Sequence, residues 1–137
     1  MENTNFIENN GSTFAGGIGA TSKLCENSST LSTDYPFVHL TNLEFNGNYA
    51  TNRGAIGTNC FQLDVLNSLF YNTEDLRGIG IVSHHSCTHI IDSIFNSNNG
   101  AIHAGGVALS AMLGGVDNTK FYSNSAPESV ACNTYYE

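Results

Sequence analysis

The fold is decided by a stretch that recurs along the chain: Asn42-Leu-Glu-Phe-Asn-Gly-Asn48, then Asn67-Ser-Leu-Phe-Tyr-Asn-Thr73, then Asp92-Ser-Ile-Phe-Asn-Ser-Asn98. Each copy places a phenylalanine at its centre, and these phenylalanines are evenly spaced, with a period of about 25 residues. Two further copies surround Phe6 and Phe121. A fixed period of this length is the signature of a repeat protein.

Two other sets of residues keep the same phase as the phenylalanines. An asparagine or aspartate stands three residues before each of them, at Asn3, Asn42, Asn67, Asp92 and Asn118. An aliphatic residue stands five residues before four of them, at Leu40, Val65, Ile90 and Val116. Glycine followed by small or aliphatic residues recurs about eight to ten residues after the phenylalanine. The period therefore describes a whole structural unit.

The unit is built from strands. Apolar residues alternate over short stretches such as Leu63-Asp-Val65, and a period near 25 is shorter than the repeats of helical pairs. Glycine and asparagine punctuate every eight residues or so, which allows three short strands and three turns in each period. We predict an all-β protein, a right-handed parallel β-helix (solenoid) of about five rungs of roughly 25 residues.

This prediction gives each recurring residue a structural role. Phe6, Phe45, Phe70, Phe95 and Phe121 should stack as the core, since equivalent residues of successive rungs lie about 4.8 Å apart. Side-chain amides both donate and accept, so the column Asn3, Asn42, Asn67, Asp92 and Asn118 should form a hydrogen-bonded ladder. The glycines should serve where the backbone turns without a Cβ.

One domain is expected over residues 1–137, as part of a longer repeat protein. The interval from Phe6 to Phe45 exceeds one period by 14 residues, which we assign to a polar loop insertion at 24–37. Loops that protrude from a solenoid often carry recognition, so this insertion is a candidate contact element.

The repeat resembles that of the chlamydial polymorphic outer-membrane proteins, a group of β-helical surface proteins. The resemblance is carried by Phe45-Asn-Gly-Asn48, Phe95-Asn-Ser-Asn98 and Phe121-Tyr-Ser-Asn124, together with elements such as Gly54-Ala-Ile56 and Gly105-Gly-Val107, and it spans about residues 3–124. It implies an elongated, autotransporter-like passenger stalk at the cell surface or outside the cell, used in adhesion. Thr73 departs from the asparagine pattern.

Composition limits the possible partners. Four Lys and Arg stand against twelve Asp and Glu, for a formal net charge of −8, and the four cations are scattered. Binding to nucleic acid or to anionic membranes is disfavoured, and no apolar run is long enough for direct membrane insertion. A protein or glycan surface remains compatible as a partner, and open strand edges favour end-to-end self-association.

Clusters of reactive or metal-binding residue types have structural explanations. His84-His-Ser-Cys-Thr-His89 offers metal-ligand side chains, but along one strand they would be spaced about 7 Å apart, so we expect no metal and no cofactor. The four cysteines are expected to be buried thiols; as an alternative, Cys60 and Cys87 could approach each other on neighbouring rungs and form a disulfide. The terminal pair Tyr135 and Tyr136 could stack on a glycan, although a fraying end or the start of another rung is favoured.

Many β-helix proteins act on polysaccharides with carboxylates on one sheet. The candidates here are Asp64, Asp92 and Asp117, with Arg53 and Arg77 as possible bases, but the three aspartates fall at different phases of the repeat. We therefore expect no catalytic residues and a noncatalytic structural or adhesive surface module. A carbohydrate-active fragment, like a polysaccharide lyase or glycoside hydrolase, is the alternative, and it requires Asp92, Asp117 and an arginine to converge.

Overall fold

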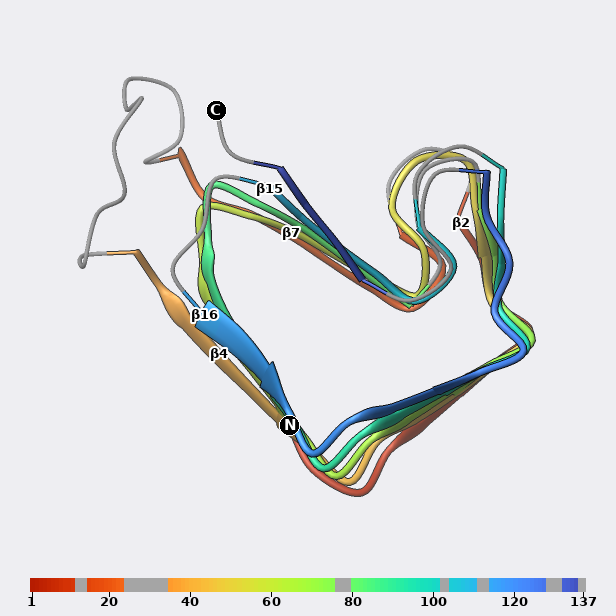
Figure 1. The fold of residues 1–137 in the computed structure, drawn as a ribbon. Helices are drawn as coiled ribbons and strands as arrows, with labels where there is room; N and C mark the ends of the chain where they lie inside the picture. The colour runs from red at the N-terminus through yellow and green to blue at the C-terminus, as the bar shows by residue number, and fades with distance from the viewer. Residues whose placement is uncertain are drawn as a thin grey trace.

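The chain forms a parallel β-solenoid, described here from a computed structural model for residues 1–11, 15–23, 35–75, 80–101, 104–110, 114–127 and 132–135. Within these residues the strands pair in parallel and form four sheets. Figure 1 looks along the stack, where rungs from the red N-terminal end to the blue C-terminal end lie almost on top of one another. The predicted β-helix is thus the observed fold.

Each sheet collects one strand from successive rungs. Sheet A comprises β4 (Phe37–Thr41), β8 (Gln62–Leu66), β12 (Cys87–Ile91) and β16 (Gly114–Asp117). Sheet B comprises β1 (Asn5–Ile7), β5 (Glu44–Asn46), β9 (Leu69–Tyr71), β13 (Ile94–Asn96) and β17 (Lys120–Tyr122). Sheet C comprises β2 (Asn10–Gly11), β6 (Tyr49–Ala50), β10 (Glu74–Asp75) and β14 (Asn99–Gly100). Sheet D comprises β3 (Ile18–Thr21), β7 (Ile56–Asn59), β11 (Ile81–His84), β15 (Val107–Ser110) and β18 (Cys132–Tyr135).

The number of rungs is slightly smaller than expected when only complete rungs are counted. Sheets B and D have five strands, whereas sheets A and C have four, so the described residues form four complete rungs and a partial fifth. A rung also contains four strands rather than the predicted three. The additional break separates sheet B from sheet C, where residues such as Gly47, Asn72 and Ser97 adopt left-handed backbone conformations with φ of 62°, 53° and 54°.

The strand register locates the extra residues of the first rung. Phe6 pairs with Phe45 and Ile18 pairs with Ile56, so both intervals are much longer than one period. Phe37 pairs with Gln62, and this interval is a single ordinary period. Thirteen of the fourteen extra residues therefore lie between β3 and β4, and one lies between β2 and β3. Most of the predicted insertion at 24–37 falls outside the described residues, and its last residue, Phe37, begins β4.

The corner between sheets A and B is a ladder of asparagine side chains. All five residues of the column, Asn3, Asn42, Asn67, Asp92 and Asn118, have a positive φ, between 43° and 55°. The Nδ2 of Asn42 donates to the Oδ1 of Asn3 at 3.2 Å, and the Nδ2 of Asn67 donates to the Oδ1 of Asn42 at 2.6 Å. The Nδ2 of Asn118 likewise donates to the Oδ1 of Asp92. Every bond of this ladder points toward the N-terminal neighbour.

Asp92 interrupts the outer ladder. By the direction of the other bonds, the residue at position 92 should donate to the Oδ1 of Asn67, and no such bond joins these two described side chains. The reason is chemical, because an ionised carboxylate accepts hydrogen bonds and cannot donate one. The ladder therefore consists of two separate segments.

A second, inward ladder lies at the corner between sheets B and C. Asn48 and Asn98 are buried there. Asn98 donates from Nδ2 to the carbonyl oxygen of Phe70 at 3.1 Å and to the Oδ1 of Asn124 at 2.9 Å. The same pattern joins Asn9 to Asn48, with 2.9 Å from Nδ2 to Oδ1. These amides satisfy backbone groups that the corner removes from the sheet ladders.

The core is the stack of five phenylalanine rings. Successive centroids lie 4.7, 4.7, 4.6 and 5.1 Å apart, and neighbouring planes differ by no more than 10°. The rings of Phe45, Phe70 and Phe95 are fully buried, and those of Phe6 and Phe121 pack on either end. Aliphatic residues of sheets A and D complete the core around Leu63 and Ile81.

The glycines directly before the strands of sheet D stand where a Cβ would not fit, as predicted. Gly17 and Gly80 are absent from the positive-φ residues, so they are not needed for a left-handed turn. A Cβ on Gly17 would lie 2.8 Å from the Phe45 ring, and a Cβ on Gly80 would lie 2.3 Å from the Phe95 ring. Glycine occurs at these positions because the phenylalanine ring of the next rung fills the space that a Cβ would occupy.

Candidate functional site

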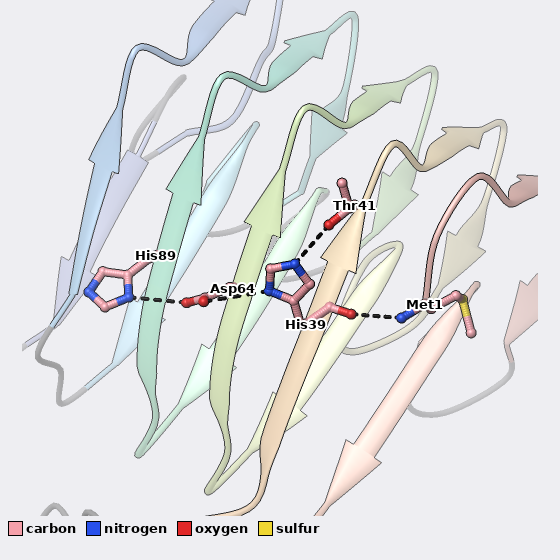
Figure 2. A network of polar contacts seen from close by, with 5 residues as sticks. All are labelled: Met1, His39, Thr41, Asp64 and His89. Carbon is pink, nitrogen blue, oxygen red and sulfur yellow. Dashed lines mark hydrogen bonds and ion pairs between the residues drawn. The ribbon is translucent and has the colours of Figure 1, made fainter.

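The outer face of sheet A carries a row of ionisable side chains. His39, Asp64 and His89 are register partners on β4, β8 and β12, and the alternation of these strands points all three outward. The Nδ1 of His89 lies 3.1 Å from one carboxylate oxygen of Asp64, and the Nδ1 of His39 lies 3.7 Å from the other. Figure 2 shows the carboxylate between the two imidazole rings.

Further contacts fix His39 at one end of the row. Its Nε2 lies 2.9 Å from the hydroxyl of Thr41, and its carbonyl oxygen accepts a hydrogen bond of 2.8 Å from the ammonium of Met1. Its ring also stacks near that of Phe37. His89 has no such second contact on its ring, and its side chain is 52% exposed. The row therefore presents one anchored and one more accessible imidazole.

Cys87 shares this face with His89. Burial raises the pKa of its thiol, and the charge of Asp64 raises that pKa further. The thiolate is the nucleophilic form of cysteine, so this environment suppresses the reactivity of the thiol. Within the part of the chain that the structure describes, no three His, Cys, Asp or Glu side chains converge to hold a metal ion.

The two cysteines considered as partners do not pair. Cys60 is disulfide-bonded, whereas Cys87 is a free thiol. Cys60 occupies the corner between β7 and β8 with a φ of 58°, and His85 occupies the equivalent corner of the next rung with a φ of 45°. Cys87 lies beyond that corner on β12, so it is out of phase with Cys60.

The carboxylates considered for catalysis are distributed over different parts of the described rungs. Asp64 lies at the middle of sheet A, between the histidines. Asp92 belongs to the corner ladder, where it accepts from Asn118. The guanidinium of Arg53 donates to the carbonyl oxygen of Thr58 at 2.8 Å, and Arg77 lies outside the described residues. Arg53 stands between β6 and β7, whereas Asp117 ends β16.

The outer face of sheet B carries three of the six exposed large hydrophobic side chains among the described residues. Its strands leave two outward columns, Asn5, Glu44, Leu69, Ile94 and Lys120 in one and Ile7, Asn46, Tyr71, Asn96 and Tyr122 in the other. Ile7, Leu69 and Tyr122 are 51%, 41% and 50% exposed. In the second of these columns, apolar or aromatic side chains thus alternate with asparagines along the stack.

Tyr71 is held in place on this face. Its hydroxyl donates to the Oε1 of Glu44, one rung away. That hydrogen bond is the main cause of the raised pKa of Tyr71, with burial and the charge of Glu44 adding to it. Because the folded pKa is raised, this interaction stabilises the fold below the ordinary tyrosine pKa and is lost as pH rises through the raised value.

One shallow hollow lies on the same face, and a second lies beside it at the corner between sheets A and B. The larger, of about 270 Å³, is lined by Leu69, Phe70, Tyr71, Ile94 and Asn96. The smaller, of about 140 Å³, is lined by Asp92, Ser93, Ile94, Asn118 and Lys120. Ile94 borders both. An apolar hollow is therefore followed, one rung further along the stack, by a polar one.

The sequence contained a signal for the row on sheet A, but a search for columns of identical residues does not reveal it. His39, Asp64 and His89 follow one another at the period of the phenylalanines, but their side chains alternate in type. Among the notable residues of the sequence, Tyr135 ends β18 and Tyr136 lies outside the described residues. Glycan stacking by this pair, the less favoured of the alternatives, is not tested by the structure.

Comparison with known proteins adds no relative to this description. No protein-family model matches the chain, and no curated protein or solved structure matches it. Among the described residues, no helix is long and apolar enough to cross a membrane. The class defined by the geometry is a parallel β-solenoid with a flat, exposed apolar sheet face.

Proposed function

We propose that this chain is a noncatalytic structural or adhesive surface module of a secreted or cell-surface β-helix protein, similar to the passenger stalks of polymorphic outer-membrane proteins. The observation that carries the proposal is the outer face of sheet B, where Ile7, Leu69 and Tyr122 are each at least 41% exposed. These side chains share one face at intervals of two rungs, and exposed apolar side chains on a common face favour a contact surface.

One further feature supports a location outside the cell, and another favours a particular kind of partner. Cys60 is disulfide-bonded, and disulfides persist chiefly in oxidising compartments. The polar surface is made mainly of neutral side chains, and the formal net charge is −8. Such a surface repels anionic polymers such as nucleic acids, so a contact with protein or glycan is favoured.

The insertion at 24–37 provides a second candidate contact element beside the sheet faces. It contributes thirteen extra residues between β3 and β4, and Phe37, where β4 begins, is 57% exposed. Deletion of residues 26–33 should weaken partner binding if this loop takes part. Unchanged binding after the deletion would assign recognition to the sheet faces alone.

A carbohydrate-active fragment is the second candidate, and the pair His89–Asp64 is the observation that favours it. The carboxylate orients Nδ1 at 3.1 Å and leaves the other ring nitrogen facing solvent, an arrangement that suits a general base. The proposal of a noncatalytic module predicts that no polysaccharide is cleaved on prolonged incubation. Product formation that is abolished by His89→Ala would support the enzyme instead.

The proposed function is tested by surface binding. Purified chain on beads should bind at least one of fibronectin, laminin, collagen or a neutral polysaccharide saturably. The double variant Leu69→Ser, Tyr122→Ser should lose at least about tenfold in affinity, because it removes apolar area from the sheet B face. Tyr49→Ser serves as the matched control, since Tyr49 is also exposed, at 39%, but lies on sheet C.

The outcomes of this test are clear-cut. Binding that depends on Leu69 and Tyr122 but not on Tyr49 supports the proposed contact face. Absence of saturable binding to the whole panel, or an equal loss in the control variant, would overturn it. Thermal unfolding of each variant shows whether a loss of binding reflects a loss of fold.

A further inference from the structure

We infer that the outer face of sheet B binds a neutral, extended glycan whose sugar rings lie along the stacking axis, over Tyr71, Ile94 and Tyr122. This inference rests on the proposed contact function and names the chemical class of its partner. Four features of the face favour such a ligand: its size, its charge, its two hollows and the fixed position of Tyr71.

The size of the face favours a thin polymer over a folded protein. Sheet B has five strands of three residues each. At about 4.8 Å between strands and about 3.3 Å per residue, its face covers on the order of 240 Å². A stable protein–protein interface requires about 800 Å² from each partner. A single extended glycan needs only a strip of this width.

The charge of the face favours a neutral glycan. Glu44 and Lys120 lie three rungs apart in one outward column, with Leu69 and Ile94 between them and Asn5 beyond Glu44. The face itself is thus balanced, while the chain as a whole carries a formal net charge of −8. A sulfated or uronate-rich polymer would be repelled by the chain and would find only one ammonium on the face.

The two hollows match the two kinds of surface that a sugar chain presents. The larger hollow is bordered by the Tyr71 ring and by Leu69 and Ile94, which suit the apolar face of a pyranose. Asn96 at its edge offers both a donor and an acceptor for hydroxyl groups. The smaller hollow adds the side chains of Asn118 and Lys120 one rung further along.

The aromatic rings have a spacing set by the solenoid. Tyr71, Asn96 and Tyr122 are successive register partners in one outward column, so the two rings are two rungs, or about 10 Å, apart. Successive sugar rings of an extended β-linked glycan are spaced at close to the distance between rungs. Every second sugar ring presents the same side to the protein. The hydroxyl of Tyr71 is already bonded to Glu44, so little side-chain freedom is lost on binding.

The experiment is a calorimetric titration of the full chain with cellohexaose, chitohexaose and β-mannohexaose, and with a heparin hexasaccharide as the anionic probe. We expect measurable binding to at least one neutral hexasaccharide and none to heparin. Tyr122→Ala and Tyr71→Ala should each lower the association constant about tenfold. Tyr71→Phe keeps the ring but loses the bond to Glu44, so its affinity should lie between those of wild type and Tyr71→Ala, and Tyr49→Ala should stay within about twofold of wild type.

Two results would overturn the inference. One is absence of binding to every neutral hexasaccharide at millimolar concentration, and the other is an equal loss of affinity in Tyr49→Ala and Tyr122→Ala. If the beads bind fibronectin, laminin or collagen through Leu69 and Tyr122 while no hexasaccharide binds, the contact function stands and the glycan fails. If neither assay shows binding through this face, both fail.

Discussion

Gly80→Ala should destabilise the solenoid by about 2 to 3 kcal/mol, in the upper part of the range for overpacked cores. The new Cβ would lie 2.3 and 2.4 Å from two carbons of the Phe95 ring and 2.6 Å from the carbonyl oxygen of Gly106. That ring has no room to move, because its centroid lies between those of Phe70 and Phe121, at 4.6 and 5.1 Å. The Gly106 oxygen is held as well, since it accepts from the backbone nitrogens of Gly80 and Ile81.

Ala55 shows what a methyl group in this column requires. It precedes Ile56, the register partner of Ile81, and it is fully buried. The residue before it, Gly54, has a φ of 49°, whereas Gly105, two positions before Val107 in the fourth rung, is absent from the positive-φ glycines. The second rung therefore has room for the methyl group of Ala55 where the preceding glycine has a left-handed conformation. The equivalent glycine of the fourth rung, Gly105, does not have this conformation.

Gly115→Ala is the matched control for this prediction. Gly115 lies on β16, and a Cβ there would meet nothing within 4 Å. The alanine also reduces the freedom of the unfolded chain, so its effect should be neutral or slightly stabilising. Urea unfolding followed by far-ultraviolet circular dichroism compares the two variants with wild type. A Gly80→Ala midpoint equal to that of wild type, or a larger loss in Gly115→Ala, would refute the packing explanation.

Three other predictions address the corner ladder, the free thiol and the strand edges. Asp92→Asn supplies the missing donor toward Asn67 and should raise the unfolding free energy by about 0.5 to 1 kcal/mol. Asp117→Asn removes the same charge outside the ladder, and an equal gain there would contradict the explanation. Cys87 should be alkylated by iodoacetamide with a midpoint pH above that of an ordinary thiol, and Asp64→Asn should lower this midpoint; an unchanged profile would count against the role of Asp64. The exposed strand edges should cause the chain to self-associate end to end, so its elution in size-exclusion chromatography should depend on concentration; a strictly monomeric profile would exclude this.

Repetition made the fold predictable from the sequence. Stacking in register places equivalent residues of successive rungs on top of one another. Phe70 and Phe95 are separated by the same number of residues as Asn42 and Asn67, so the sequence alone shows the length of one rung. The number of strands per rung was less accessible. The break between sheets B and C occurs at Gly47, Asn72 and Ser97, which share a backbone conformation but no residue type.

The candidate sites were harder to predict because they lie on outward positions. Alternation along a strand fixes which side chains enter the core, but it leaves the identity of the outward residues free. The row of His39, Asp64 and His89 becomes visible only when complementary rather than identical side chains are aligned. The hollow beside Tyr71 and the bond from its hydroxyl to Glu44 depend on side-chain conformations, which the register alone does not specify.

The common direction of the amide bonds has a consequence for how such a chain can change in length. Asn42 donates to Asn3 and accepts from Asn67, so it meets one neighbour as a donor and the other as an acceptor. A duplicated segment of one period, inserted in frame, would bring one donor and one acceptor with it and leave the column satisfied. Gene segments encoding one rung can therefore be gained or lost as units, and the length of the molecule can vary between related genes without any compensating substitution at its corners.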